Sequence, residues 1–150
     1  MVRVGLLAAA YVALTMLFAP WSFGLVQVRV SEMLTVLPYV MPAATPGLFI
    51  GCLVANILGG LGVVDVVLGS SATLLAAFLT SKMPAPWLAP LPPVLVNALV
   101  VAWYLSVWAG VPYWMGMLSV FAGQVVACYV LGYPLLVYIM RHERLREYLK

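Results

Sequence analysis

Charged residues are scarce in this sequence. Seven Lys and Arg and four Asp and Glu make up 7% of its 150 residues, whereas a soluble protein has roughly 25%. Hydrophobic residues account for 66%. So few charges cannot cover a surface that faces water, and the composition therefore excludes a soluble globular domain and predicts an integral membrane protein.

Histidine and cysteine are also rare, which excludes the usual catalytic and metal-binding motifs. His142 is the single histidine, and Cys52 and Cys128 lie in apolar stretches without CxxC spacing. The sequence has no Ser/His/Asp set, P-loop, HExxH or paired carboxylates. We therefore predict that the protein is not an enzyme, uses no cofactor and binds no metal, and that both cysteines are buried thiols.

The apolar residues fall into six segments. A helix needs about 20 apolar residues to cross a bilayer, and its backbone must be hydrogen-bonded internally. We predict an all-α bundle of six transmembrane helices that forms one substrate-binding domain over residues 1–150, with a short basic tail at 141–150. The expected helices are Val2–Ala19, Ser31–Ala43, Pro46–Gly59, Asp65–Ser81, Pro90–Ala109 and Pro112–Met140.

The basic residues predict the orientation. With six spans both termini lie on one side of the membrane, together with Arg3, Lys82 and the basic tail, and Arg29 remains on the other side. Because cytoplasmic loops carry an excess of Lys and Arg, we expect a multi-pass plasma-membrane protein with both termini in the cytoplasm. The net charge of +3 comes almost wholly from the tail, and contact with membrane lipid explains it better than nucleic-acid binding.

Polar residues inside the apolar segments are candidate ligand contacts, because burying such groups in hydrocarbon is costly. Glu32 is the foremost, since a carboxylate there can accept hydrogen bonds from the N–H groups of a heterocycle or an amine. The alternative is a carboxylate stabilised by the helix N-terminus and paired with Arg29. The predicted substrate-binding residues are Glu32, Asn97, Asn56, Gln124, Arg29, Asp65, Tyr104 and Trp108.

Several of these candidates have a structural alternative. Asn56, Asn97 and Gln124 offer donors and acceptors that suit the edge of a purine-like ring, but such side chains also bond one membrane helix to another. Asp65 follows a glycine turn, where N-capping is the default role. At 1.5 Å per residue, we expect Asn97 and Gln124 near the midplane and Glu32, Asn56 and Asp65 near the outer surface.

Two aromatic residues share a helical face with Asn97. Tyr104 and Trp108 follow it at i+7 and i+11, so their rings lie above the amide on one side of the helix. Stacking on a planar ligand is one interpretation of this face. The other is an interfacial aromatic belt that includes Tyr113 and Trp114.

Small residues recur every four positions in the first helix, at Gly5, Ala9 and Ala13. Such a stripe lets another helix approach closely. Packing within this chain and docking onto a partner subunit both explain the pattern. We predict that these three residues contact a partner subunit.

Several sequence blocks resemble those of one family. The blocks are Gln27–Thr35 (QVRVSEMLT), Pro46–Cys52, Ala55–Asn56, Gly59–Gly62 with Asp65, and Pro92–Ala98. Together they are similar to the QueT-type queuosine-precursor transporter family. Its members are taken to be substrate-binding S components of energy-coupling factor (ECF) transporters, and the resemblance extends over most of the chain.

The resemblance implies a bundle of the ECF S-component type that captures a 7-deazapurine, namely preQ1, preQ0 or queuine, from outside. It also implies three partners, a transmembrane coupling subunit and two ATPase subunits, with Ala9 and Ala13 at the coupling subunit and Arg29 and Glu32 over the ligand. The alternatives are an S component for another vitamin such as thiamine or biotin, a self-sufficient proton-coupled carrier using Glu32 or Asp65, and a structural subunit without a ligand.

Overall fold

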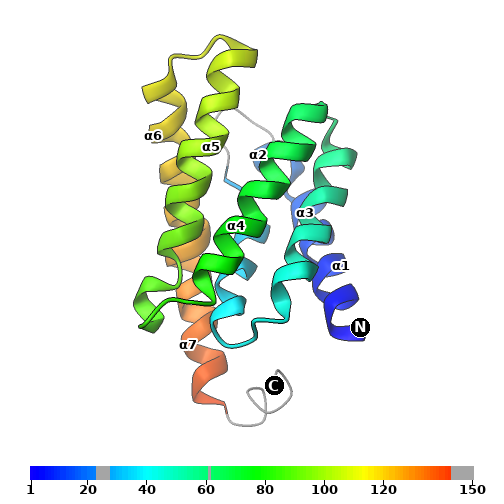
Figure 1. Ribbon diagram of the computed structural model, residues 1–150, viewed down its shortest axis with the longest axis vertical. Coiled ribbons are helices and arrows are strands. Elements are labelled where there is room, and N and C mark those ends of the chain that lie inside the picture. The colour runs from blue at the N-terminus through cyan, green and yellow to red at the C-terminus, as the bar shows by residue number, and fades with distance from the viewer. Residues whose placement is uncertain (23–27, 61, 143–150) are drawn as a thin grey trace.

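The computed structural model describes residues 1–22, 28–60 and 62–142, apart from the side chains of residues 108 and 109. Over these residues every regular element is a helix (Figure 1), as predicted. The α-helices are α1 (Val2–Leu17), α2 (Ala19–Ser22), α3 (Ala44–Gly59), α4 (Ser70–Thr80), α5 (Leu91–Ala109), α6 (Tyr113–Gln124) and α7 (Tyr133–Arg141). The 3-10 helices are η1 (Val30–Tyr39) and η3 (Pro86–Leu88), and the π-helices are η2 (Asp65–Gly69) and η4 (Val125–Gly132).

Some of these elements follow one another without a break and form one continuous helix. When they are taken together, most of the predicted helix boundaries agree with the structure to within two residues. η2 and α4 form one helix over Asp65–Thr80, and α6, η4 and α7 form one of 29 residues over Tyr113–Arg141. Gly60 ends α3 in the left-handed conformation, with a φ of 68°. Glycine adopts this conformation without the penalty that a Cβ brings, which is why it commonly ends helices.

The second predicted helix differs in type and length. Instead of an α-helix over Ser31–Ala43, the chain forms the ten-residue 3-10 helix η1, which contains Pro38. Proline has no N–H to donate and disfavours a continuous α-helix. A 3-10 helix rises about 2.0 Å per residue against 1.5 Å for an α-helix. η1 is therefore thinner and more extended than predicted, and Ser31, Glu32 and every residue from Leu34 to Pro38 are buried.

The bundle is apolar outside and partly polar inside. Large hydrophobic side chains such as Leu6, Ile57 and Val107 are 71%, 59% and 71% exposed, while Glu32, Asn56 and Asp65 are at most 2% exposed. Two helices, Pro86–Val107 and Tyr113–Arg141, are long and apolar enough to cross a membrane. This distribution is the reverse of that in soluble proteins and suits an exterior that faces lipid.

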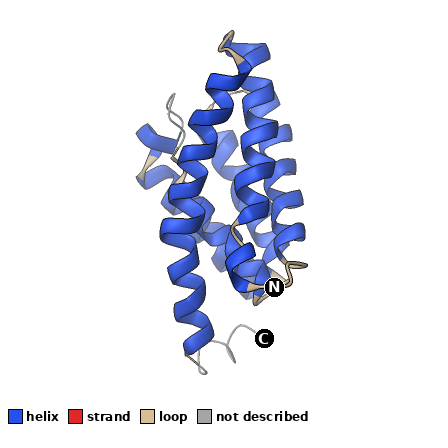
Figure 2. Cartoon of the chain, turned by 90° about the vertical axis from the view of Figure 1, so that its left-hand side faces the viewer, coloured by secondary structure: helices blue, strands red, loops and turns tan. Residues whose placement is uncertain are grey.

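Figure 1 shows α1 and α3 packed on one side of the bundle and α5 and α6 on the other, with α4 between them. The start of α1 and the end of α7 lie at the same end of the bundle. Figure 2, turned by 90°, shows the described chain as an elongated bundle of helices joined by loops. η1 packs against α1, α4 and η4, and so lies inside the bundle.

Glycines allow the close contact between α1 and α3. A Cβ built at Gly51 would lie 2.8 Å from Tyr11 Cβ and 3.0 Å from the Ala8 carbonyl oxygen, and one at Gly47 would lie 2.8 Å from the Val4 carbonyl oxygen. Both glycines are buried. The glycines at this contact therefore lie on α3, and the face of α1 that meets them includes Ala8 and Tyr11.

Gly51→Ala is expected to destabilise the bundle by about 1–3 kcal/mol, because the added methyl group meets the backbone of α1 and forces the two helices apart. Gly5→Ala is the matched control, since a Cβ at Gly5 has nothing within 4 Å. Thermal unfolding in detergent measures the effect. Equal unfolding midpoints for the two variants would show that the α1–α3 contact is looser than described.

Candidate functional site

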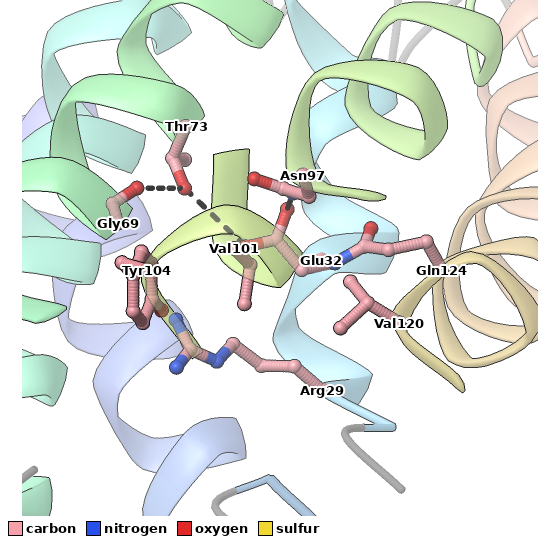
Figure 3. Close-up of a pocket in the computed structure, with 9 residues that line it drawn as sticks. All are labelled: Arg29, Glu32, Gly69, Thr73, Asn97, Val101, Tyr104, Val120 and Gln124. Atoms are coloured by element: carbon pink, nitrogen blue, oxygen red, sulfur yellow. Dashed lines mark hydrogen bonds between the residues drawn. The ribbon is translucent and has the colours of Figure 1, made fainter. Parts of the chain in front are cut away.

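Glu32 lies at the centre of a buried hydrogen-bond cluster and is 1% exposed. Its Oε1 accepts hydrogen bonds from the hydroxyl of Tyr11 on α1 and from Thr73 Oγ1 on α4, the latter at 3.4 Å. Its Oε2 accepts one from Asn97 Nδ2 on α5 at 3.2 Å (Figure 3). Side chains of three other helices thus meet one carboxylate, which offsets the cost of burying it.

A cavity adjoins this carboxylate. Five of the predicted ligand residues line it, and they are joined by a glycine, a threonine and two valines. The lining residues are Arg29, Glu32, Gly69, Thr73, Asn97, Val101, Tyr104, Val120 and Gln124. The free volume is about 10 Å³, which is room for roughly one water molecule. A ligand with rings therefore requires these side chains to move apart.

Arg29 borders the cavity at the start of η1 and is 8% exposed. Its Nη1 donates to Cys52 Sγ at 3.6 Å, and in Figure 3 its side chain extends toward Tyr104. The carboxylates of Glu32 and Asp65 are buried as well, at 1% and 2% exposure. Arg29 thus places a guanidinium in the same buried interior as two carboxylates.

A second polar cluster lies behind Gly69 and Tyr104. Asp65 Oδ1 accepts a hydrogen bond from the Tyr104 hydroxyl, and Asn56 Nδ2 donates to the Asp65 carbonyl oxygen at 3.1 Å. Asp65 makes no capping hydrogen bond and is 2% exposed, so its expected N-cap role is wrong. Asp65 Oδ2 and Asn56 Oδ1 are buried and have no hydrogen-bond partner within the described chain.

Gln124 lines the cavity on the side opposite Gly69 and Tyr104 (Figure 3). Its side chain points toward Glu32 in Figure 3, and its Oε1 accepts a hydrogen bond from Cys128 Sγ at 3.4 Å. The π-helix η4 begins at the next residue, and η2 begins at Asp65. Wide turns of this kind often lie at functional sites, where they redirect side chains. Both π-helices flank the two polar clusters.

Three further residues of the polar clusters, Tyr11, Cys52 and Thr73, were not predicted from the sequence. Cys52 Sγ lies 3.3 Å from Thr73 Oγ1 and 3.5 Å from Asn56 Nδ2. A signal for Thr73 was present, because it follows Asp65 by eight residues and shares its helical face. Tyr11 had no such signal, since a tyrosine in an apolar helix looks like an ordinary packing residue.

Residue spacing predicted different depths for Glu32 and Asn97, and this difference is wrong. The Glu32 carboxylate accepts a hydrogen bond from Asn97 Nδ2 at 3.2 Å, so the two side chains lie at one level. The prediction assumed that Glu32 begins a helix at the outer surface. It belongs instead to η1, whose residues are buried among the other helices.

Asn56 and Asp65 are predicted ligand residues that do not line the cavity. Asn56 and Asp65 form the second cluster, and the side chain of Trp108 lies outside the described residues. Gly5, Ala9 and Ala13 are exposed on α1, while Ala8, Tyr11 and Thr15 are buried on its other face. Within the described chain these three residues are therefore not covered by another helix, and their contact with a partner subunit stays a prediction.

Sequence comparison assigns the chain to a family. The model of a family described as QueT transporter matches residues 1–141. The chain belongs to the QueT transporter family. No curated protein and no solved structure matches it.

Membership in the QueT family makes this chain a transporter and not an enzyme, as predicted. Transport across a membrane agrees with the apolar exterior of the bundle and with its two long apolar helices. The match covers the described cavity and every residue that lines it. Both polar clusters thus lie in the part of the chain that the family shares.

Proposed function

We propose that this QueT protein is the substrate-binding S component of an ECF-type importer and captures a queuosine precursor, such as preQ1, from outside the cell. The observation that carries the proposal is the buried Glu32 carboxylate beside a cavity, hydrogen-bonded by side chains of three other helices. In a transporter, an ionisable group inside the membrane domain marks a substrate pathway by default.

The chemistry of the cavity suits a 7-deazaguanine. The edge of this base carries a ring N–H beside an exocyclic amine, and one carboxylate can accept hydrogen bonds from both. Asn97 and Gln124 offer amide donors and acceptors for the remaining edge atoms. Val101 and Val120 add apolar surface to the lining. The ligand then takes over the hydrogen bond that Glu32 now receives from Asn97, and Thr73 keeps its own.

Binding in this scheme is coupled to opening of the cavity. The present volume of about 10 Å³ is too small for two fused rings. The Asn97 donor connects α5 to Glu32 on η1, so a ligand that replaces it loosens the contact between these two helices. A ligand can shift the bundle toward an open state only by binding that state more tightly.

The orientation and the partners are part of the same proposal. The start of α1 and the end of α7 at one end of the bundle (Figure 1) suit termini that are both cytoplasmic. The chain has no nucleotide-binding motif, so ATP-driven uptake requires a transmembrane coupling subunit and two ATPase subunits. The exposed Gly5, Ala9 and Ala13 offer a flat helical surface for the coupling subunit.

A ligand panel tests the proposal. The purified chain is titrated in detergent with preQ1, preQ0, queuine, thiamine and biotin, and we expect saturable binding of deazapurines only. Reconstituted in vesicles, it should take up preQ1 only with the coupling subunit, the ATPases and ATP. Saturation by thiamine or biotin, or uptake by the chain alone that an uncoupler abolishes, would contradict the proposal.

Thr73→Val is expected to weaken preQ1 binding about three- to tenfold, because it removes a neutral hydrogen-bond donor at Glu32 without changing side-chain volume. Thr80→Val is the matched control on the same helix. Thr80 is also buried, but its hydroxyl donates to the Ala89 carbonyl oxygen at 3.1 Å, away from the cavity lining. Calorimetric titration of both variants measures the difference, and equal affinities would exclude Thr73 from the site.

A further inference from the structure

The interior of the membrane domain has an unbalanced charge. Before the basic tail that begins at Arg141, the sequence holds five charged residues, Arg3, Arg29, Glu32, Asp65 and Lys82. Arg3 and Lys82 are exposed, whereas Arg29, Glu32 and Asp65 are 8%, 1% and 2% exposed. The buried interior of the described chain therefore holds two carboxylates and one guanidinium. An excess negative charge in a medium of low dielectric constant favours the entry of a cation.

Three buried side-chain atoms have no hydrogen-bond partner among the described residues, namely Asp65 Oδ2, Asn56 Oδ1 and Ser70 Oγ. The serine hydroxyl can donate or accept, and the other two atoms belong to the second polar cluster. A carboxylate oxygen and an amide oxygen can only accept hydrogen bonds, so the group that would satisfy them must donate. A protonated amine carries three N–H donors and a positive charge, and it supplies both missing properties at once.

Gly69 lies between the cavity and Asp65, and its missing side chain leaves the two close together. A Cβ built at Gly69 would lie 2.9 Å from Asn56 Nδ2, 3.4 Å from Asp65 Oδ1 and 3.7 Å from the Tyr104 hydroxyl. Three polar side chains therefore converge on the one cavity-lining residue that has no side chain. Gly69 and Tyr104 both line the cavity (Figure 3). A ligand bound at Glu32 is thus separated from Asp65 by a glycine and by a tyrosine already bonded to that carboxylate.

We propose that this transporter selects deazapurines that carry a protonated amine, and that the Asp65 carboxylate is the counter-ion of that amine while Glu32 binds the base. The inference rests on the proposed function and adds to it the charge of the ligand. It predicts a preference for preQ1, with its aminomethyl group, over analogues in which this group is neutral.

The test compares preQ1 with its hydroxymethyl analogue, which has the same size and no charge. Calorimetric titration of the full chain in detergent uses a sodium-free buffer, so that Na⁺ cannot replace the amine. We expect preQ1 to bind at least about 30-fold more tightly than the analogue, as for the loss of a charge-assisted hydrogen bond. Equal affinity of the unmodified protein for the two ligands overturns the inference but leaves the proposed function intact. Binding of neither ligand overturns the proposed function itself.

Asp65→Asn identifies the counter-ion. The substitution keeps an oxygen for the Tyr104 hydroxyl and replaces the other carboxylate oxygen by an amide NH₂ group. The affinity for preQ1 should therefore come to within about threefold of the affinity for the hydroxymethyl analogue. Thermal unfolding of the ligand-free Asp65→Asn variant reports on its folding. Glu32→Gln should lower the affinities for both ligands by the same factor. An unchanged ratio of the two affinities in Asp65→Asn overturns the assignment of Asp65.

Discussion

Glu32→Gln is expected to lower the affinity for preQ1 by about 100-fold. The substitution preserves shape but removes the charge and turns one of two acceptor oxygens into a donor, which opposes the N–H groups of the base. Hydrogen bonds to a charged group contribute about 1.5–3 kcal/mol each, and 1.4 kcal/mol is a factor of ten in affinity. Calorimetric titration in detergent measures the loss.

The folded bundle should tolerate this substitution. Tyr11 and Thr73 can still donate to the amide oxygen of the glutamine. The Asn97 carboxamide, which donates to Glu32 at 3.2 Å in the unmodified protein, can rotate by 180° and accept a hydrogen bond from the new amide. Thr80→Val again serves as the control for a buried polar change elsewhere. If Glu32→Gln bound preQ1 as tightly as the unmodified protein while unfolding at the same temperature, Glu32 would be a structural residue only.

The double substitution Ala9→Leu and Ala13→Leu is expected to reduce ATP-driven preQ1 uptake at least about tenfold and to leave preQ1 affinity unchanged. Both alanines are exposed on α1, on the face opposite Tyr11 and Thr15. Two leucines prevent a partner helix from approaching the backbone closely, and overpacking of this kind costs about 1–3 kcal/mol per site. Uptake into vesicles that contain all four subunits measures the effect.

Ala122→Leu provides the matched control for this surface. Ala122 is likewise a small, exposed residue in the middle of a helix, but it lies on α6. Uptake by this variant should equal that of the unmodified protein. Full uptake by the double α1 variant would show that the coupling subunit binds elsewhere, and a parallel loss of preQ1 affinity would show that the α1 substitutions act through the site.

The helices could largely be predicted from local sequence, because their ends depend on nearby residues. The break at Gly59-Gly60 placed the end of α3, and Pro112 placed the start of α6. η1 could not be predicted in this way. Its residues are apolar enough for a membrane helix, and only its burial among the other helices, together with Pro38, accounts for a 3-10 conformation.

The sequence predicted site residues whose side-chain type is rare in apolar segments, but it did not predict which side chains contact one another. Glu32, Asn97 and Gln124 stood out because amides and carboxylates are rare in apolar segments, and all three line one cavity. Tyr11 and Cys52 did not stand out. A hydroxyl on an apolar helix or a buried thiol is ordinary in sequence, and either becomes part of a polar cluster only through the neighbours that the fold supplies.

The sequence by itself determined the membrane character, the helical segments and the small set of polar groups among them, since these follow from composition and from hydrogen bonds between near neighbours. The tertiary structure decided which polar groups meet. Spacing along a helix fixes the face and the height of a side chain on that helix, but the position of each helix relative to the others depends on packing at residues such as Gly51. For this reason Glu32 and Asn97, expected at different depths, share one hydrogen bond.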